Sequence, residues 1–403
     1  MTNWQTKKLG EVCDIGAGNS APQKREYFID GIYPFFRTSD IGQVHIGRIT
    51  KSSDYLNDKG IKGLKLFNKG TILLPKSGAS TFLNHRVVLG IDGYVSSHLA
   101  TIKTDEKVLN NNYLFYFLQE VKAQDLIQDH KYPSLNLPVI GNIEISYPES
   151  IPEQHRIVKI LDEVFEKTTK AKENAEKNLN NSKELFESYL QSVFTDDAEQ
   201  KKLGDKSLFQ IIDGDRGKNY PKKSDFHNEG YCLFLNTKNV RPNGFDFKTT
   251  MFITEKKDNV LGNGKLKRND VLLTTRGTIG NIAVYNGNVL FENIRINSGM
   301  LIFRPNTKLI IPEYLFAIFQ SGIMKTQIKK YVSGAAQPQL PIKTLVNFSI
   351  PVPKSISEQK SIVAKLDKLS AETKKLEAIY KQKLVDLEEL KKSVLKKAFA
   401  GEL

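Results

Sequence analysis

The sequence predicts an α+β fold in which two mixed, strand-rich globular domains are separated by two long α-helices that form an antiparallel coiled coil. The 403-residue chain repeats itself once, each copy opens with short β-type runs among Gly, Asn and aromatic residues, and each closes with a stretch free of Pro and Gly. These observations predict a first domain over residues 1–150, a helical region over 151–198, a second domain over 199–355 and a helical region over 356–403. The fold is thus an internal repeat of pseudo-two-fold character.

Matching motifs recur in the same order in both halves. Lys-Lys-Leu-Gly followed by an acidic residue occupies 7–11 and 201–205, and Tyr-Leu-Phe occupies 113–115 and 314–316. Glu-Gln recurs at 153–154 and 358–359, so the offset grows from 194 to 205 residues, which places insertions inside the module. The ends of the helical regions also match, through Leu185, Ser188, Leu190 and Phe194 in the first and Leu390, Ser393, Leu395 and Phe399 in the second.

The stretches 153–195 and 357–400 contain neither Pro nor Gly and predict the two helices. Their apolar residues recur at alternating spacings of three and four, which is typical of a coiled-coil seam, with Lys383 as an interruption. The alternative is that each helix packs only on its own domain. The predicted seam residues are Leu161, Phe165, Thr168, Ala175, Leu179, Ser182, Phe186, Tyr189 and Val193 in the first helix and Leu366, Leu369, Thr373, Leu376, Tyr380, Leu387, Leu390 and Val394 in the second.

Charge supports this pairing and also indicates an anionic partner. Residues 151–198 hold 7 basic and 10 acidic side chains, whereas residues 351–403 hold 12 and 8, so the two helical regions attract each other. The whole chain carries a net charge of +14, with 24 basic and 25 acidic residues before position 199 and 35 and 20 after it. If both halves bind one polyanion, we expect the second to supply more of the salt-sensitive affinity. The alternative is a solvated basic surface.

The predicted helices also set a length scale. A helix of about 40 residues is about 60 Å long, and an antiparallel pair would keep two domains apart at opposite ends. Two DNA half-sites separated by about 34 Å per helical turn suit such a spacer.

Several classes of protein are disfavoured. No stretch approaches the roughly 18–20 apolar residues of a membrane span, and residues 1–10 lack a signal-peptide core, so a cytoplasmic protein is expected. The two cysteines, Cys13 and Cys232, support neither a disulfide framework nor a metal site. The six His residues are scattered, and the run 262–265 lacks the upstream Gly and the hydroxyl of a phosphate-binding loop. We therefore predict no catalytic residue and no metal site, and interpret the segment 213–218 as a turn.

The duplicated motifs resemble the specificity subunit of type I restriction-modification systems over almost the whole chain. The resemblance rests on the repeated opening, the segment 334–340 (Gly-Ala-Ala-Gln-Pro-Gln-Leu), the junctions 145–157 and 350–362, and the terminal residues 397–403. In place of the segment 334–340 the first copy has Lys-Tyr-Pro-Ser-Leu-Asn-Leu at 131–137, so we expect the halves to read different sequences.

This resemblance implies two target-recognition domains joined by two conserved helical regions, each domain reading one half of a divided double-stranded DNA target. It also implies two adenine-methylating methyltransferase subunits and, in the full complex, restriction subunits. The chain itself would be non-catalytic and would hold no cofactor, with S-adenosylmethionine, ATP and Mg expected on the partner subunits. The alternatives are the recognition subunit of a methylation-only complex, or a paired-domain scaffold that binds protein or RNA.

Polar loops after apolar runs are the candidate DNA contacts, because bases are read by Arg, Lys, Asn, Gln and hydroxyl side chains held on ordered loops. The loops at Lys76 and Arg276 are predicted to be equivalent in the two copies. For every candidate the alternative is a turn or surface polar residue. The candidates are Arg37, Thr38, Ser39, Lys76, Ser77, Asn84 and Arg86 in the first domain and Asn236, Lys238, Asn239, Arg241, Thr275, Arg276, Asn281 and Arg295 in the second.

Overall fold

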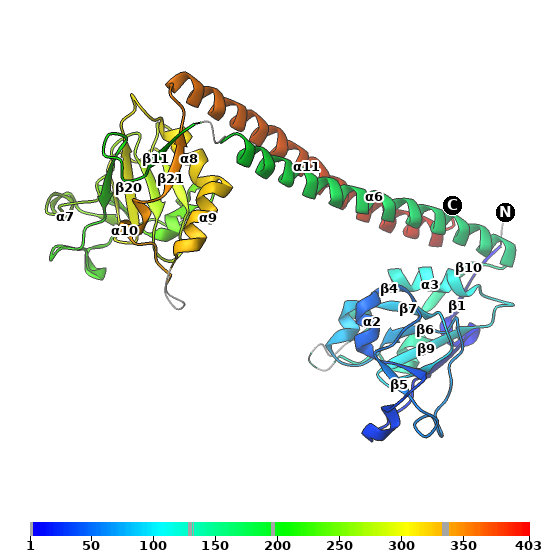
Figure 1. The fold of residues 1–403 in the computed structure, drawn as a ribbon. Helices are drawn as coiled ribbons and strands as arrows, with labels where there is room; N and C mark the ends of the chain where they lie inside the picture. The colour runs from blue at the N-terminus through cyan, green and yellow to red at the C-terminus, as the bar shows by residue number, and fades with distance from the viewer. Residues whose placement is uncertain (1–2, 128–130, 132, 195–197, 333–337) are drawn as a thin grey trace. The chain divides into compact units, whose positions relative to one another are not determined.

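The computed structural model describes residues 3–127, 131, 133–194, 198–332 and 338–403 (Figure 1). The chain forms two compact units, one of Met1–Ala175 with Gln382–Leu403 and one of Glu176–Lys381. Each unit holds one globular domain together with parts of both long helices. Most of the resemblance segment 334–340 lies outside the described residues.

The first domain is built around a five-stranded sheet of order β2-β9-β6-β7-β4, in which only the β4–β7 pair is parallel. A three-stranded sheet, β5-β3-β8, and a two-stranded sheet, β1-β10, complete it. The strands are β1 (Trp4–Lys8), β2 (Cys13–Ala17), β3 (Tyr33–Phe36), β4 (Ile46–Ile49), β5 (Asp54–Leu56), β6 (Ile72–Pro75), β7 (Arg86–Leu89), β8 (Tyr94–Val95), β9 (Leu99–Thr104) and β10 (Glu144–Pro148). The helices are α1 (Leu9–Val12), α2 (Thr38–Val44), α3 (Asn111–Glu120), α4 (Ala123–Leu126) and α5 (Leu137–Gly141).

The second domain has the same plan, with sheets β12-β20-β17-β18, β16-β13-β19 and β11-β21 and a short β14-β15 pair. In both domains the middle strand of the three-stranded sheet pairs in parallel with the last one, β3 with β8 and β13 with β19. The strands are β11 (Glu199–Lys202), β12 (Phe209–Asp213), β13 (Cys232–Leu235), β14 (Val240–Arg241), β15 (Gly244–Phe245), β16 (Phe252–Ile253), β17 (Val271–Thr274), β18 (Ile282–Val284), β19 (Ile294–Ile296), β20 (Met300–Pro305) and β21 (Ser349–Val352). The helices are α7 (Glu255–Asn259), α8 (Pro312–Gln320), α9 (Gly322–Tyr331) and α10 (Ile342–Leu345).

The repeated Glu-Gln motif has one structural purpose in both copies. Gln154 is fully buried, accepts a hydrogen bond from the Asn110 N–H (2.7 Å) and donates one to the Val108 carbonyl (3.0 Å). Gln359 is also fully buried and donates to the carbonyl of Leu309 (2.8 Å). Buried amides require such partners, so each Gln fixes the start of a long helix against the loop that precedes α3 or α8. The predicted repeat is therefore confirmed at the level of single hydrogen bonds.

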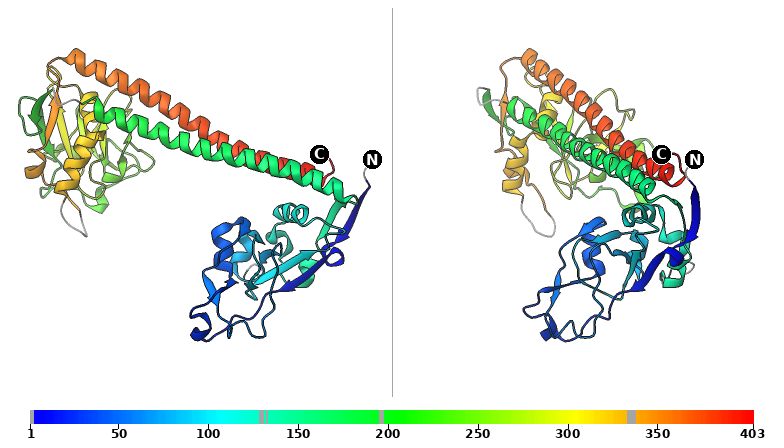
Figure 2. Two further views of the ribbon diagram at one scale, coloured as in Figure 1. Left: turned by 45° about the vertical axis from the view of Figure 1, so that its right-hand side comes forward. Right: turned by 90° about the vertical axis from the view of Figure 1, so that its right-hand side faces the viewer.

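The long helices are α6 (Ile151–Ser192) and α11 (Ile356–Phe399), and they lie side by side within each unit (Figure 2). In the first unit the start of α6 packs on the end of α11, where Leu161, Leu395 and Ala398 share the domain core. Lys172 Nζ also lies 2.9 Å from Glu388 Oε1. The helices therefore run antiparallel.

In the second unit the pairing is reversed, and the end of α6 packs on the start of α11 through Leu190 and Leu366. The Phe194 ring lies 5.6 Å from the ring of Tyr314, and in the first unit the Phe399 ring lies 5.2 Å from that of Tyr113. Each domain core thus contains the start of the helix that follows the domain and the end of the other helix. The predicted fold class is confirmed.

The seam predicted for α11 differs in register from the one in the structure. Leu376 and Leu390 are 39% and 46% exposed, whereas Glu377 and Leu384 are half-buried. Positions 373, 377, 380, 384 and 387 keep the alternating spacing of a coiled coil, so the seam continues through Leu384 and leaves Lys383 in solvent. The residues predicted for the α6 seam are buried or half-buried. Among the described residues, no helix is long and apolar enough to cross a membrane.

The shared cores predict that the end of α11 stabilises the first domain. Leu395→Ala is expected to lower the free energy of unfolding of that unit by about 2–5 kcal/mol, because Leu395 is 5% exposed and its removal leaves a cavity. Leu390→Ala, the same change at a 46% exposed position of the same helix, is the control. Hydrogen exchange of α3 under native conditions measures both, and equal protection in the two variants would contradict the shared core.

Candidate nucleic-acid interface

Three segments converge in the second domain where strands of its two sheets end. They are residues 236–239 after β13, residues 275–277 after β17, and the turn 297–299 between β19 and β20. The Thr275 N–H donates to the Gly299 carbonyl (2.8 Å), and the Thr278 hydroxyl donates to the Thr237 carbonyl (3.4 Å). These bonds make one loop cluster of segments that lie up to about 60 residues apart in the sequence.

The first domain forms the equivalent cluster from residues 37–40 after β3, residues 76–78 after β6 and the turn 96–98 between β8 and β9. The Lys76 N–H donates to the His98 carbonyl (3.0 Å), as Thr275 does to Gly299. The predicted equivalence of the two loops is thus seen in the structure.

Each loop also pairs with the segment in which the two copies differ most. Ser77 forms a β-bridge with Ser134, and Arg276 forms one with Gln339. The divergent segments predicted at 131–137 and 334–340 therefore reach the two loop clusters at the residues that the structure describes.

A glycine directly after β2 in the first domain and after β12 in the second lets the strand approach the turn that belongs to the loop cluster. A Cβ on Gly18 would overlap the carbonyl oxygens of Val95 and Ser96, and a Cβ on Gly214 would overlap that of Asn297. Any larger residue would push the turn 96–98 or 297–299 away from the strand that supports it.

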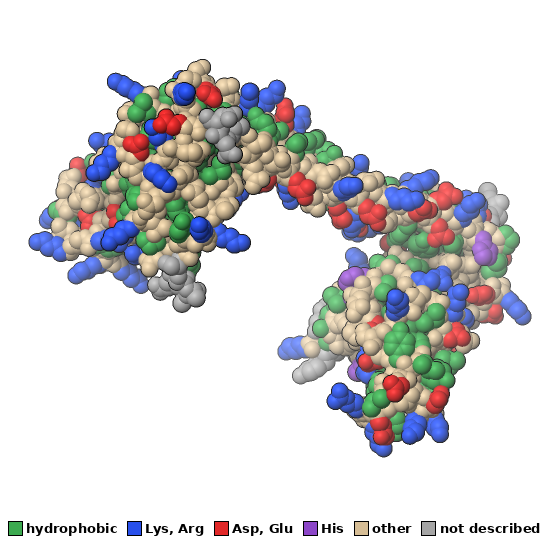
Figure 3. Space-filling model, viewed as in Figure 1, with side chains coloured by type: hydrophobic (Ala, Val, Ile, Leu, Met, Phe, Trp, Pro, Cys, Tyr) green, Lys and Arg blue, Asp and Glu red, His purple; other side chains and the backbone are tan. Residues whose placement is uncertain are grey.

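Several candidates lie in these clusters with their side chains available. Arg276 and Lys238 are exposed, and among the described residues no hydrogen bond or ion pair reaches either side-chain nitrogen. Thr38 and Lys76 are half-buried, Ser39 is exposed, and Ser77 Oγ lies 2.8 Å from His98 Nδ1. Figure 3 shows further Lys and Arg side chains over the surface of the second domain.

Two further arginine candidates, one in the first cluster and one just after a segment of the second, are held by carboxylates. The Arg37 guanidinium pairs with Asp54 and lies 5.1 Å from the centre of the Phe35 ring. Arg241 Nε lies 4.0 Å from Asp246 Oδ2. Both are therefore oriented by the domain itself.

Arg86 is placed inside the first domain and not in its loop cluster. Its guanidinium donates to the carbonyls of Leu118 (3.0 Å), Val121 (2.9 Å) and His85 (2.9 Å), and burial lowers the pKa of Arg86 to about 10. The carbonyls of Leu118 and Val121 lie at the end of α3, so the guanidinium, which is 1% exposed, is held inside the domain. The structure gives this residue a structural role in place of the predicted contact.

Arg295 is likewise internal. Its Nε pairs with Asp258, and its Nη1 donates to the carbonyl of Asn263 (2.7 Å). Burial alone would raise the pKa of Asp258, but hydrogen bonds from Lys265 and Arg295 outweigh it and hold that pKa below its usual value. The predicted base contact is replaced by a buried charge cluster that joins β19 to α7.

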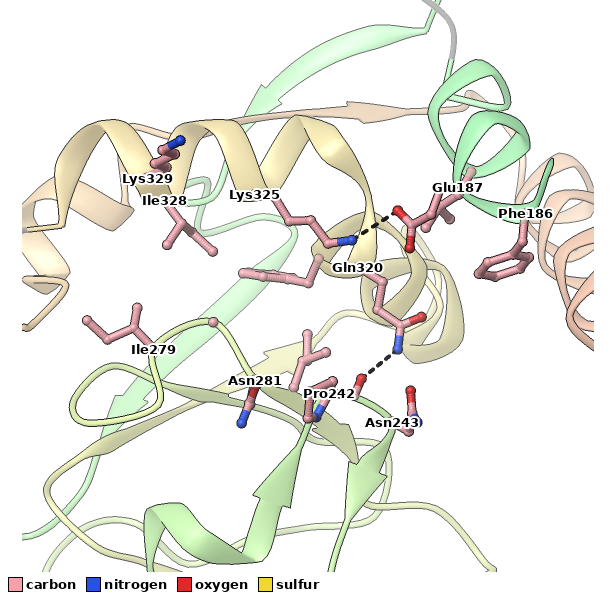
Figure 4. Close-up of a pocket in the computed structure, with 14 residues that line it drawn as sticks. Phe186, Glu187, Pro242, Asn243, Ile279, Asn281, Gln320, Lys325, Ile328 and Lys329 are labelled. Atoms are coloured by element: carbon pink, nitrogen blue, oxygen red, sulfur yellow. Dashed lines mark hydrogen bonds and ion pairs between the residues drawn. The ribbon is translucent and has the colours of Figure 1, made fainter. Parts of the chain in front are cut away.

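The remaining candidates are polar side chains that bond to backbone groups of their own domain. Asn281 is an example, because its amide donates to the Val240 carbonyl (2.9 Å). It stands on the wall of a cavity of about 400 Å³, where Gln320 donates to the Pro242 carbonyl (2.9 Å) and Lys325 pairs with Glu187 (3.1 Å) (Figure 4). The others and their partners are Asn84 with the Ala123 N–H (2.8 Å), Asn236 with the Lys238 N–H (2.8 Å), Asn239 with the Thr249 carbonyl (2.7 Å) and Thr275 with the Gly299 carbonyl (3.1 Å).

Sequence reasoning missed the turns that complete the clusters. His98 and Ser97 follow the two-residue strand β8, and Ser298 follows the three-residue strand β19. Such short runs give no clear strand signal. Arg216 was also missed; it is exposed, and its Nη2 lies 2.9 Å from Asp213 Oδ2 and 3.3 Å from the Ser298 carbonyl. Aligning the two copies turn by turn could have found these positions.

The segment 213–218, predicted as a turn, is an irregular loop after β12 that bends at Gly217 and enters a turn at Lys218, and it is organised around a buried carboxylate. Asp215 accepts hydrogen bonds from the backbone N–H groups of Gly217 (2.7 Å) and Gly262 (2.7 Å). Burial alone would raise the pKa of Asp215, but these backbone hydrogen bonds hold it below its usual value. Burial also raises the pKa of the Cys13 and Cys232 thiols to about 12, which disfavours the thiolate form.

The chain is similar to type I restriction enzyme specificity subunits, in one case over its whole length. The type I restriction enzyme MjaVIII specificity subunit of Methanocaldococcus jannaschii is 24% identical over 425 residues, which cover 100% of this chain and 93% of that protein. The type I restriction enzyme EcoBI specificity subunit of Escherichia coli is 33% identical over 141 residues, 34% of this chain and 28% of that protein.

Two solved structures share the fold. One, described as the structural basis of complex assembly and conformational transition of the type I R-M system, has a TM-score of 0.74 at 19% identity and matches over 99% of this chain and 98% of its own. The HsdS subunit from Thermoanaerobacter tengcongensis has a TM-score of 0.66 at 19% identity, over 99% of this chain and 97% of its own.

The family model for the type I restriction modification DNA specificity domain matches the chain twice, over residues 1–181 and 195–385. The first match contains the loop cluster of the first domain and the sheets that support it, and the second match contains those of the second domain. The chain therefore belongs to the type I restriction modification DNA specificity family.

Proposed function

We propose that this chain directs a type I restriction-modification complex to a divided DNA target, with each domain reading one half-site. The observation that carries the proposal is the loop cluster found at the same place in both domains. In each cluster, side chains capable of base recognition stand at equivalent positions on a backbone that the rest of the domain holds rigid. Membership of the specificity family supports this reading.

The chemistry of the clusters differs between the domains, as two unlike half-sites require. The structurally equivalent positions hold Ser77 in the first domain and Arg276 in the second. An arginine can donate two hydrogen bonds to O6 and N7 of guanine, whereas a hydroxyl accepts or donates one bond to several bases. We infer that Lys238 and Arg216, which are also exposed, contact phosphates, and such contacts fix register without reading sequence.

The catalytic steps then belong to partner subunits. We infer that two adenine methyltransferase subunits bind S-adenosylmethionine, that restriction subunits use ATP and Mg, and that this chain supplies recognition only. The role places the complex with the cellular DNA, in the cytoplasm of a prokaryotic cell.

A row of apolar residues on α11 supports the docking of a methyltransferase subunit. Leu376 and Ile379 are 39% and 50% exposed, although they lie on a long helix whose other face is already packed. Leu369, seven residues before Leu376, extends the same side of the helix, since positions seven apart share one face. Exposed apolar rows of this kind mark protein interfaces.

The first experiment maps methylated adenines across the genome of a host that expresses the complex. Deleting the chain is expected to erase a divided motif, whereas Arg276→Ala relaxes only the half read by the second domain and Lys76→Ala only the other half. The loss of one bidentate contact corresponds to about 1–3 kcal/mol, or about 5- to 150-fold in discrimination. Lys308→Ala removes an exposed charge at the loop before α8 and is the control. Retention of both half-motifs in the Arg276 variant would exclude that residue as a reader.

A second experiment separates recognition from folding. Arg295→Ala is expected to lower the free energy of unfolding of the second unit by about 3–5 kcal/mol, because Asp258 stays buried with one partner lost. Arg276→Ala, at an exposed position, is expected to change it by less than about 0.5 kcal/mol. Urea unfolding followed by hydrogen exchange of β13 and β19 measures both. Similar losses in the two variants would contradict the structural role of Arg295.

A third experiment tests docking. The double variant Leu376→Asp with Ile379→Asp is expected to prevent co-purification with the methyltransferase subunit, because two carboxylates would be buried in the interface. Val385→Asp places the same charge at a 49% exposed position on another side of α11 and is the control. Unchanged stoichiometry in the double variant would show that the partner binds elsewhere.

A further inference from the structure

We propose that the first domain contains a site for the phosphate group of a small ligand, separate from the DNA-reading loops. A pocket of about 380 Å³ opens at the end of the main sheet where β6 begins and β9 ends. Its walls bring together Arg48 from β4, Lys69 from the turn before β6 and Lys103 from β9. The inference does not depend on the proposed function of the chain.

The basic side chains of this pocket lack carboxylate partners. Among the described residues, no ion pair reaches Arg48, Lys69 or Lys103, and Lys103 Nζ donates only to the Lys69 carbonyl (3.2 Å). Glu106 is the one acidic residue among the described residues that line the pocket, and it lies within 4.0 Å of none of the three cations. Three positive charges against one negative charge favour an anion in the pocket.

In the second domain, the basic residue that corresponds to Lys103 is paired with a carboxylate. The carbonyls of Thr71 and Asp270 accept equivalent strand bonds, from Leu89 and Tyr285 respectively, so the two residues correspond. Asp270 binds Arg304 through two hydrogen bonds of 2.8 Å. In the first domain the corresponding positions hold Thr71 and Lys103, and the Thr71 hydroxyl bonds to its own turn (2.7 Å to the Asn68 carbonyl).

The second basic position differs in the same way. Arg268 corresponds to Lys69; its Nη2 lies 3.0 Å from Glu292, and its guanidinium lies 4.2 Å from the centre of the Tyr285 ring. In the second domain, Arg268 and Arg304 are therefore paired with carboxylates of the same domain. In the first domain, the corresponding Lys69 and Lys103 face a pocket and have no such partner among the described residues.

The remaining walls supply neutral hydrogen-bonding groups. Gly70 has φ +89°, and a Cβ there would lie 3.3 Å from Lys103 Nζ, so its absence leaves the ammonium free to turn into the pocket. The His155 ring, at the start of α6, lies 3.5 Å from Asn110 Nδ2. The N-terminus of α3 is not itself the site, because Asn110 Oδ1 already accepts from the N–H groups of Asn112 (3.0 Å) and Tyr113 (3.0 Å).

The position of the pocket favours a small ligand over the backbone of the recognised DNA. Residues 70 and 76 flank the two ends of β6, whose four residues of extended strand span about 13 Å. The loop cluster therefore lies at one end of this strand and the pocket at the other. A phosphate group offers the charge and the three acceptor oxygens that such a set of cations binds, and the volume falls in the range of small-molecule sites.

The test titrates the purified full-length chain with inorganic phosphate and with AMP by calorimetry. The double variant Lys69→Gln with Lys103→Gln is expected to weaken binding about tenfold or more, as the loss of charge-assisted hydrogen bonds predicts. Lys59→Gln with Lys107→Gln removes two exposed charges of the same domain outside the pocket and should leave binding unchanged. Thr71→Asp installs the carboxylate of the second domain and should also abolish binding, by pairing with Lys103.

Three results would overturn the inference. They are the absence of saturable phosphate or AMP binding, binding that is unaffected by the Lys69 and Lys103 changes, and an effect of those changes that is confined to duplex DNA. The last result would assign the cations to the DNA backbone. The methylation motif is read in the same variants, and it should not change. Failure of this site therefore stays distinguishable from failure of the recognition loops.

Discussion

The structure depends on the burial of one helix end in the core of each domain, and the helix end buried in the first domain comes from the opposite end of the sequence. Leu395 and Ala398 complete the core of the first domain, and Leu190 and Phe194 complete that of the second. Full burial of one large apolar side chain contributes about 1.5–3 kcal/mol, a large share of a net stability of about 5–15 kcal/mol. The first unit is therefore not complete within one contiguous stretch, because it needs residues 382–403, whereas the second unit is the contiguous stretch Glu176–Lys381. In both units the end of a long helix contributes a Leu-x-x-x-Phe pattern to the core, Leu190 with Phe194 and Leu395 with Phe399.

Features that are repeated along the sequence could be predicted from it. The Glu-Gln motif, the Tyr-Leu-Phe motif and the two helices all appear where the duplication placed them, because each satisfies a local geometric need twice. The equivalence of the loops at Lys76 and Arg276 could also be predicted, since both follow a run of apolar residues that forms the centre of a sheet. The α11 seam was predicted one residue out of register in places. Leu376 and Leu384 fit a heptad pattern about equally well, and only the position of α6 decides between them.

Features that depend on long-range contacts could not be predicted. The sequence does not reveal that Arg295 faces Asp258, 37 residues before it, or that Arg86 closes the end of α3. Arg86 begins β7 and Arg295 lies within the short strand β19, and it is their burial that separates them from the exposed Arg276. The turns at His98 and Ser298 escaped prediction for another reason, because the strands before them are too short to leave a pattern in the sequence.

The two domains also show how a common scaffold tolerates different recognition chemistry. Where the first domain buries Arg86 among backbone carbonyls, the strand pairing of the second places Ile282 at the corresponding position. A buried charge that loses its partners is far more costly than an apolar residue at the same place, so such an exchange requires that the surroundings change with it.

The hydrogen bonds that position the loop clusters are different in kind. The bonds from Lys76 to His98 and from Thr275 to Gly299 join backbone atoms, so they persist whatever side chains the loops carry. Exposed residues of the clusters such as Arg276 are therefore free of the constraint that couples residues in the core, and they can diverge while the backbone geometry that presents them is retained.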